Sequence, residues 1–280
     1  MQRVLYGVSP IGLGHATRTI AIVGRLSEAG VDVRLLSGGD TARFLEDCGY
    51  PTYDLVSDSA PTVVGGEMKR TSLWYVRSWA GLKLTMPRTE RVFDEYRPDL
   101  VVCDEEFSGI TVAARRGCRR VFISDELELG FARGRVARII ERRVDRWYRE
   151  LQRSVDLLIV PDIGVDEGNR LYVGPVVRKV SLSGDETRVR YGLPRTGKMI
   201  LLSMSGSRIG AFLLDVVVGA MAERPIPDAF LVVSGNKGRR ISGDGIYDLG
   251  VVLDNQNLVG AADLVVSTAG KSTQDEAASA

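Results

Sequence analysis

The sequence predicts an α/β protein made of two doubly wound, Rossmann-like domains that face a cleft. Short, β-rich apolar runs alternate with helical patterns along the chain, which is typical of parallel sheets covered by helices. A length of 280 residues suits two ordinary domains or one large one. A stretch rich in glycine and proline, Pro161 to Pro194, separates two such series. We therefore expect domains at residues 1–162 and 163–280, with a ligand site in the cleft between them.

The first series contains six expected strands and five expected helices. The polar, glycine-rich segment from Ser57 to Arg70 is expected to be a mobile loop. The strands are expected at Val4–Val8, Val31–Leu36, Thr52–Val56, Leu100–Cys103, Val121–Ile123 and Leu157–Val160, and the helices at Ala16–Ala29, Thr41–Cys48, Leu73–Tyr96, Phe107–Arg116 and Arg133–Arg153.

The second series is shorter and contains four expected strands. The strands are expected at Met199–Met204, Phe230–Ser234, Gly250–Leu253 and Leu264–Ser267, and the helices near Ile209–Ala222 and Lys271–Ala280.

Composition restricts the class of protein. A hydrophobic content of 44% and a charged content of 26% are typical of a soluble globular protein, and a net charge of +1 disfavours a nucleic-acid partner. The scattered cysteines Cys48, Cys103 and Cys118 are expected to be buried thiols of a reducing cytoplasm, without a disulfide framework or a metal site. The N-terminus does not resemble a signal peptide, and the apolar stretch from Gly210 to Met221 contains Asp215 and is too short to span a bilayer.

The single histidine lies in a glycine turn directly after the first expected strand. In Gly12-x-Gly14-His15-x-x-Arg18 the glycines let the backbone approach a ligand, and the following helix presents free N–H groups. His15 can bind phosphate when charged or take a proton from an attacking hydroxyl when neutral. The alternative is a helix-capping turn with an exposed histidine. A dinucleotide site is disfavoured because the third glycine and the ribose-binding acid are missing.

A second motif begins the last expected helix. Gly270 ends a strand, Ser272 or Thr273 can cap the helix, and Glu276 follows three residues after Thr273 as in a capping box. That structural interpretation is compatible with a ligand role for the same carboxylate.

Acidic residues follow two neighbouring strands of the first series. Asp104-Glu105-Glu106 and Asp125-Glu126 stand where the carboxyl ends of parallel strands are expected. From there they can reach an acceptor hydroxyl or orient His15, or they can be solvated loop acids.

The segment from Phe131 to Arg153 contains eight arginines and three acids. Its apolar residues recur at helical spacing, at Val136, Ile140, Val144, Trp147 and Leu151. Such a helix can bind an anionic membrane surface or an acidic partner, or its apolar stripe can simply pack on the sheet. The aromatic stretch from Trp74 to Leu84 is a second candidate lipid contact.

Three motifs together resemble the GT-B glycosyltransferases of the MurG-like family 28 type, in particular their archaeal-type branch. They are the Gly12–Arg18 turn, the Leu201-Leu-Ser-Met-Ser205-Gly206-Ser207 turn, and Ala262–Ala277, which is the most specific. The resemblance covers nearly the whole chain. It implies transfer of a sugar from a UDP-sugar to a hydroxyl or phosphate acceptor, which can be lipid-linked, by a metal-independent enzyme without a cofactor that can associate with the membrane.

The resemblance also assigns roles to residues. Glu276 matches the carboxylate that binds the ribose hydroxyls, and Thr273 matches the position at the diphosphate. The stretch Val251-Val-Leu253-Asp-Asn-Gln256 resembles the loop whose backbone binds the uracil edge. Asp104 and Glu106 match an acidic pair of the archaeal-type branch, and the register of Asp125 and Glu126 stays open. The candidate catalytic residues are His15, Asp104 and Glu106, and the candidate donor-binding residues are Gly12, Gly14, Ser205, Gly206, Ser207, Leu253, Gly270, Ser272, Thr273 and Glu276.

Two other functions stay open: a nucleotide-sugar 2-epimerase, and a non-catalytic nucleotide-sugar-binding subunit that needs a partner. Members of the family continue beyond the position of Ala280. We therefore expect a second domain that is truncated, with the Leu264–Ser267 strand unpaired on one side.

Overall fold

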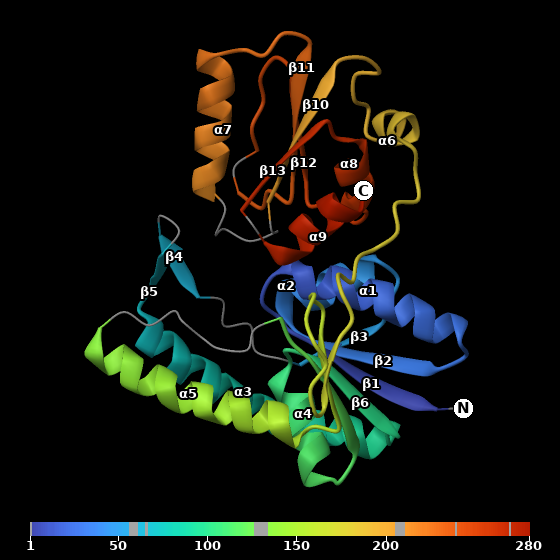
Figure 1. Ribbon diagram of the computed structural model, residues 1–280, viewed down its shortest axis with the longest axis vertical. Coiled ribbons are helices and arrows are strands. Elements are labelled where there is room, and N and C mark those ends of the chain that lie inside the picture. Colours follow the sequence, from blue (N-terminus) through green and yellow to red (C-terminus); the bar gives the residue numbers. More distant parts are fainter. Residues whose placement is uncertain are drawn as a thin grey trace. The chain divides into compact units, whose positions relative to one another are not determined.

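The computed structural model describes residues 2–55, 61–64, 67–125, 134–204, 211–238, 240–268 and 270–280 (Figure 1). The chain divides into two compact units. The first comprises Met1–Ile11, Thr19–Thr62 and Met68–Val176, and the second comprises Gly12–Arg18, Val63–Glu67 and Val177–Ala280.

The first unit is built on a parallel sheet whose described strands have the order β3-β2-β1-β6-β7-β8-β9. The chain builds outward from β1 in both directions, which defines a doubly wound sheet. Because crossover connections are right-handed, α1 and α2 cover one face, and α3, α4 and α5 cover the other (Figure 1). The elements are β1 (Arg3–Val8), α1 (Leu13–Glu28), β2 (Asp32–Ser37), α2 (Gly39–Asp47), β3 (Thr52–Asp54), α3 (Thr71–Tyr96), β6 (Leu100–Asp104), α4 (Phe107–Arg115), β7 (Arg119–Ile123), α5 (Arg135–Ser154), β8 (Leu157–Val160) and β9 (Arg170–Tyr172).

The central strands of this sheet are buried on both faces, which explains their continuous apolar sequence. Leu5 on β1 and Val101 on β6 are fully buried, as is Phe122 on β7. Of the three cysteines, Cys103 is buried as expected, whereas Cys48 and Cys118 are only half-buried.

Two segments of the first series differ from expectation. Strand β9 pairs with β8, so residues 163–176, which the sequence assigned to the second domain, lie with the first unit. The segment predicted to be a loop from Ser57 to Arg70 contains a separate two-stranded sheet of β4 (Thr62–Val64) and β5 (Glu67–Lys69). Short strands such as these give too few residues for a periodicity to be recognised.

The second unit contains a smaller parallel sheet with the order β12-β11-β10-β13 among its described strands. Alternate residues of β10 face opposite sides: Met199 and Leu201 pack toward α8, while Ile200 and Leu202 pack toward α7. The elements are α6 (Gly184–Arg190), β10 (Lys198–Ser203), α7 (Ala211–Glu223), β11 (Ala229–Ser234), β12 (Ile246–Gly250), α8 (Asn255–Ala261), β13 (Leu264–Ser267) and α9 (Lys271–Ser279).

The expected strand Gly250–Leu253 is wrong. The strand β12 ends at Gly250, whose φ of +65° takes the backbone out of the extended region, and residues 251–254 form a turn before α8. The apolar sequence of that turn was mistaken for a strand. At the other side of the sheet β13 forms the edge, with Leu264 52% exposed.

Candidate functional site

The start of the last helix, α9, lacks the side-chain cap that the sequence predicted. Gly270 is the N-cap of α9, and no side chain caps the helix there. Ser272 and Thr273 lie inside the first turn, where the Thr273 N–H donates to the Gly270 carbonyl at 3.1 Å. The capping box considered for Thr273 and Glu276 is therefore wrong, and Glu276 has another role.

Glu276 is buried and bound by side chains that are distant in sequence. It is 7% exposed, and its Oε1 lies 3.5 Å from Nη2 of Arg178. Burial raises the pKa of Glu276, while the charge of Arg178 and the hydrogen bonds from Arg178 and Asn255 oppose that rise. A carboxylate held in this way can accept hydrogen bonds from two vicinal hydroxyls of a ligand.

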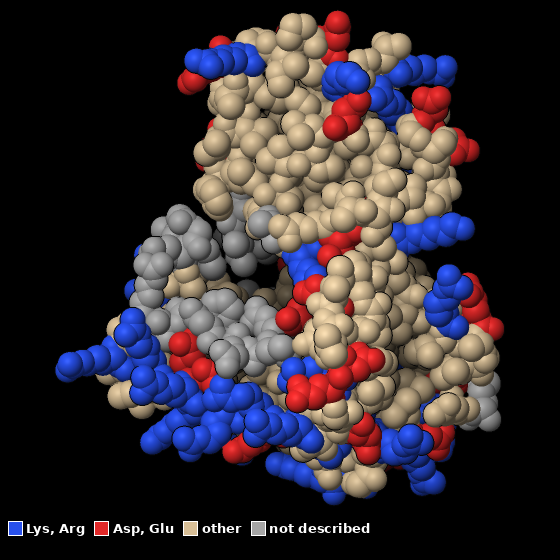
Figure 2. Space-filling model, in the orientation of Figure 1, with Lys and Arg blue, Asp and Glu red and all other residues tan. Residues whose placement is uncertain are grey.

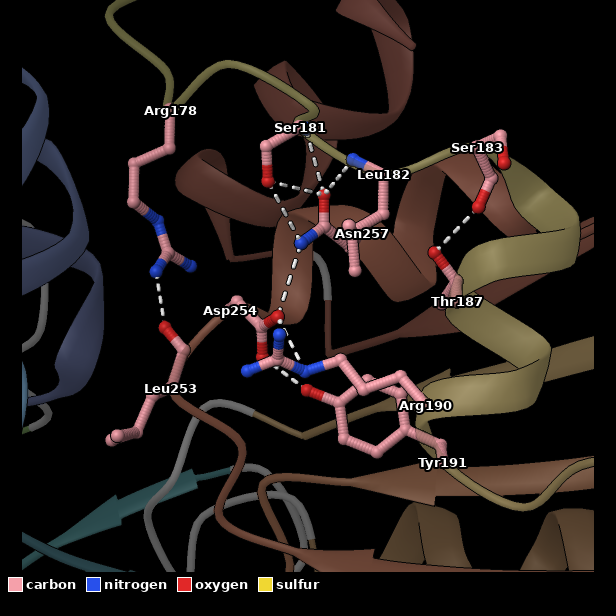
Figure 3. Close-up of polar contacts among 10 residues, drawn as sticks. All are labelled: Arg178, Ser181, Leu182, Ser183, Thr187, Arg190, Tyr191, Leu253, Asp254 and Asn257. Carbon is pink, nitrogen blue, oxygen red and sulfur yellow. Dashed lines mark hydrogen bonds and ion pairs between the residues drawn. The ribbon is translucent and has the colours of Figure 1, made fainter.

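Arg178 joins this carboxylate to the turn that follows β12. Its Nη1 donates to the carbonyl oxygen of Leu253, as Figure 3 shows, and its Nε is buried without a hydrogen-bond partner in the described part of the chain. Burying a guanidinium costs free energy unless it is paired, and the contacts with Glu276 and Leu253 supply that pairing. The sequence analysis missed Arg178. The only signal was the basic pair Arg178-Lys179 between valines.

The turn beside Leu253 is fixed by a second network. Asp254 accepts hydrogen bonds from the hydroxyl of Tyr191 and from Nδ2 of Asn257, the latter at 3.0 Å (Figure 3). The Oδ1 of Asn257 accepts from the backbone N–H groups of Ser181 and Leu182 at 2.9 and 3.2 Å. Burial raises the pKa of Asp254, but the hydrogen bonds outweigh it, and the pKa lies below its usual value. The loop predicted to bind the base is thus held rigidly.

The predicted donor residues Ser205, Gly206 and Ser207 lie outside the described residues. The strand that precedes them, β10, ends at Ser203, which is buried.

The histidine turn has a defined geometry of its own. Gly12 has a φ of +80°, and α1 begins at Leu13, so Gly14 and His15 lie in its first turn. Nη2 of Arg18 lies 3.2 Å from Nδ1 of His15. Because a guanidinium can only donate, Nδ1 accepts this bond and the ring carries its proton on Nε2. In this arrangement His15 presents an N–H donor to a ligand.

Glu106, one of the predicted catalytic acids, is the N-cap of α4. It is 1% exposed and accepts hydrogen bonds from the N–H groups of Ser108 and Gly109, each at 2.7 Å, and from the Ser108 hydroxyl at 2.6 Å. Burial raises its pKa against these hydrogen bonds. Asp104 is fully buried. A catalytic role for either stays a prediction, and the geometry of Glu106 favours a structural one.

The neighbouring Glu105, which the sequence analysis did not select, is partly exposed. Its φ is +49°, an unusual conformation for a residue with a side chain. Its Oε1 accepts from the hydroxyl of Ser124 at 2.9 Å, and Ser124 in turn lies 2.6 Å from the hydroxyl of Tyr148. Glu126 lies outside the described residues. Within the described ranges no group of three His, Cys, Asp or Glu residues could hold a metal ion.

The arginine-rich helix α5 packs against α3 with a face that differs from the predicted stripe. Its buried residues include Glu141 and Tyr148, and Glu141 accepts a hydrogen bond from the hydroxyl of Tyr75 on α3 at 3.1 Å. Val136 and Trp147, expected on the packed stripe, are exposed. The spacing of apolar residues alone does not predict that a buried glutamate, hydrogen-bonded to a tyrosine, lies on the packed face of α5.

The outer surface of α3 and α5 combines exposed apolar and basic side chains. We call it the α3–α5 surface, and Figure 2 shows Lys and Arg gathered over α5. Nζ of Lys83 lies 5.3 Å from the centre of the Trp79 ring. The surface includes exposed Leu73, Val76, Trp79, Leu84, Val136, Ile139 and Trp147 together with exposed Arg135, Arg138, Arg142, Arg143, Arg146 and Arg153. None of the helices in the described segments is long and apolar enough to cross a membrane.

Comparisons with solved structures define the fold class. The glycosyltransferase SsfS6 of Streptomyces sp. SF2575 has a TM-score of 0.62 and 16% identity, with 99% of this chain and 78% of that one covered. The spinosyn rhamnosyltransferase SpnG has a TM-score of 0.65 and 15% identity over 99% and 77%. The α/β fold with two parallel sheets is therefore that of the GT-B glycosyltransferases, and the predicted fold class is confirmed.

Sequence comparisons find archaeal relatives that are also named glycosyltransferases. An uncharacterised glycosyltransferase of Methanosarcina acetivorans is 24% identical over 196 residues, which cover 64% of this chain and 52% of the relative. One from Methanosarcina mazei is 26% identical over 201 residues, which cover 68% and 52%. The chain thus spans about half the length of these curated relatives. No family model matches it.

Proposed function

We propose that this chain is part of a glycosyltransferase that moves a sugar from a nucleoside diphosphate donor to a hydroxyl or phosphate acceptor. The observation that carries the proposal is the buried carboxylate of Glu276, which pairs with Arg178 beside a fixed turn. The fold likeness to glycosyltransferases supports it, among them SsfS6 in complex with thymidine diphosphate, with a TM-score of 0.63.

In the donor site Glu276 would accept hydrogen bonds from both ribose hydroxyls, and the turn at Leu253 would receive the base. The first turn of α9, with Ser272 and Thr273, would bind the diphosphate, because a helix N-terminus stabilises negative charge. That charge grows as the sugar leaves, so the same groups would also assist the reaction. We propose UDP as the nucleotide, on the resemblance of the motifs, and metal-independent chemistry on the same basis.

His15 would act on the acceptor or on the departing phosphate. With its proton on Nε2 it can donate a hydrogen bond to an oxyanion. To remove a proton from an acceptor hydroxyl, it would first have to exchange tautomer or release Arg18 from Nδ1. The present geometry therefore favours His15 as a hydrogen-bond donor in the resting protein.

The α3–α5 surface favours a peripheral membrane location, and hence a lipid-linked acceptor. Exposed tryptophans and aliphatic residues beside a row of arginines form the combination that binds anionic lipid surfaces.

The test is a calorimetric screen with UDP, TDP and their sugar conjugates, followed by an assay for sugar transfer. A nucleotide at about 100 times its Kd should stabilise the protein by about 2.7 kcal/mol. Binding of neither nucleotide would overturn the proposal. Donor binding without transfer or hydrolysis would favour a non-catalytic subunit, and turnover of the donor without any acceptor would favour an epimerase. His15→Ala should retain nucleotide binding and lose transfer.

A further inference from the structure

The loop after β11 is fastened to the end of β12 by one buried aspartate. The side chain of Asp248 on β12 is 2% exposed, and its Oδ2 accepts hydrogen bonds from Nδ2 of Asn236 at 2.8 Å and from the N–H of Ile241 at 3.0 Å. Its Oδ1 accepts from the N–H of Gly250 at 3.0 Å. These bonds hold the loop beside the turn that follows β12.

Arg240, which belongs to this loop, lies against the backbone at Gly250. Its Nη1 donates to the carbonyl oxygen of Asp248 at 2.6 Å. A Cβ atom placed on Gly250 would lie 2.9 Å from Nη2, 3.1 Å from Cζ and 3.4 Å from Nη1 of Arg240. A side chain at this position would therefore displace the guanidinium, and the glycine leaves the space that it occupies.

The turn next to Gly250 presents apolar side chains on its surface. In this turn of residues 251–254, Val251 is 40% exposed and Leu253 is 38% exposed. The Arg240 side chain is 69% exposed, and the hydrogen bond and the ion pair that it makes in the described part of the chain both use Nη1. Its Nη2 can therefore donate to a ligand. Aliphatic groups beside a planar cation suit a flat ring with polar edges.

We propose that Arg240 recognises the base of the nucleotide and donates through Nη2 to a ring carbonyl oxygen of uracil or thymine at the 251–254 turn. This inference rests on the proposed function, because it adds a specificity-determining residue to the same nucleoside site. A guanidinium can only donate hydrogen bonds. It therefore matches the carbonyl group of uracil and thymine, and it cannot pair with the amino group that cytosine carries at the same ring position.

An exposed arginine can also bind phosphate, but the sheet places Arg240 far from the proposed diphosphate site. The strands β12 and β13 are the two edges of the sheet in its described order β12-β11-β10-β13. Arg240 lies at the end of β12, whereas α9, with Ser272 and Thr273, follows β13. Three strand spacings of about 4.8 Å put roughly 14 Å between the two places. The base end of a nucleotide therefore fits the position of Arg240 better than the diphosphate does.

The test compares wild type with Arg240→Met and Arg240→Lys by calorimetry against UDP, TDP, CDP, uridine and pyrophosphate. Methionine keeps a long side chain without donors, and lysine keeps the charge without the planar fork of donors. Arg224→Met is the matched control, because Arg224 is an exposed arginine of the same unit that directly follows α7. Melting temperatures confirm that each variant is folded under the conditions of the titration.

We expect wild type to bind UDP more tightly than CDP. Arg240→Met should bind UDP and uridine about tenfold more weakly, as for one lost hydrogen bond from a charged group, and pyrophosphate as wild type. Its affinity for CDP should fall less, so that the preference for uracil shrinks. Arg240→Lys should also lose preference for uracil, whereas a purely electrostatic role would leave it like wild type. Arg224→Met should match wild type for every ligand.

Equal losses for UDP and CDP in Arg240→Met, or a loss for pyrophosphate, would overturn base recognition and assign Arg240 to the phosphates. Wild-type affinity of Arg240→Met for UDP would remove Arg240 from the site and leave the proposed function standing. If the wild type binds no nucleotide, the proposed function fails and the inference fails with it.

Discussion

Each unit of the molecule contains a buried glutamate near the end of a parallel sheet, and the two glutamates are held in opposite ways. Glu106 is bound by N–H groups and a hydroxyl that follow it within three residues. Glu276 is bound by Arg178, which is distant in sequence. Burial raises the pKa of both. The partners, and not the burial, therefore distinguish them.

The difference indicates what each carboxylate does. The partners of Glu106 are the unsatisfied N–H groups at the start of its own helix, so the contact is a helix cap. Arg178, the partner of Glu276, comes from a distant segment, and this contact satisfies no helix end. Burying the pair of Glu276 and Arg178 costs desolvation energy, and no helix end needs this contact. We therefore interpret the pair as part of a ligand-binding site.

The largest effect is expected from Arg178→Met. This variant leaves the buried carboxylate of Glu276 without its cation, which should lower the free energy of unfolding by about 3–5 kcal/mol. The double variant Arg178→Met/Glu276→Gln should recover most of that loss, because no uncompensated charge remains. Urea unfolding followed by circular dichroism measures both. A single variant as stable as wild type would mean that Arg178 does not compensate Glu276.

Removing the other carboxylate should affect stability alone. Glu106→Ala leaves the N–H groups of Ser108 and Gly109 without acceptors and should cost about 3 kcal/mol. Nucleotide affinity, measured at a temperature where the variant is folded, should match wild type. A wild-type melting temperature combined with lost sugar transfer would instead assign Glu106 to catalysis.

The pH dependence of nucleotide binding sharpens the contrast. Hydrogen bonds from ribose hydroxyls need an ionised Glu276, and burial raises the pKa of this residue above its ordinary value of 4.5. Affinity should therefore be full above the raised pKa and fall as the pH drops through it. In Glu276→Gln this acid limb should be absent. Calorimetric Kd values between pH 4.5 and 8 test this, and an identical acid limb in both proteins would exclude Glu276 as its cause.

The smallest effect concerns the α3–α5 surface of the first unit. Replacing one exposed arginine of α5, as in Arg142→Gln, should weaken partitioning onto anionic vesicles by about 1 kcal/mol, or roughly fivefold. Arg25→Gln on α1 is the control and should partition as wild type. Flotation with anionic and neutral vesicles measures this. Equal recovery with both lipids would mean that the surface does not bind membranes electrostatically.

The sequence predicted the sheets well because their strands are buried apolar runs with sharp ends. The prediction failed where tertiary contacts override the local pattern. A strand was expected at Gly250–Leu253, but the positive φ at Gly250 ends β12 there and a turn follows. Glu276 was found from its motif, but Arg178 was not. The two residues lie 98 positions apart, and no local spacing reveals such a contact.

The most direct test of the account is calorimetric titration of UDP into wild type, Glu276→Gln and Glu106→Gln under the same conditions. We expect Glu276→Gln to bind roughly 10- to 100-fold more weakly, as expected for lost hydrogen bonds to a charged group, and Glu106→Gln to bind as wild type. Equal affinity of wild type and Glu276→Gln, or a loss confined to Glu106→Gln, would contradict the assignment of the nucleotide site to the second unit.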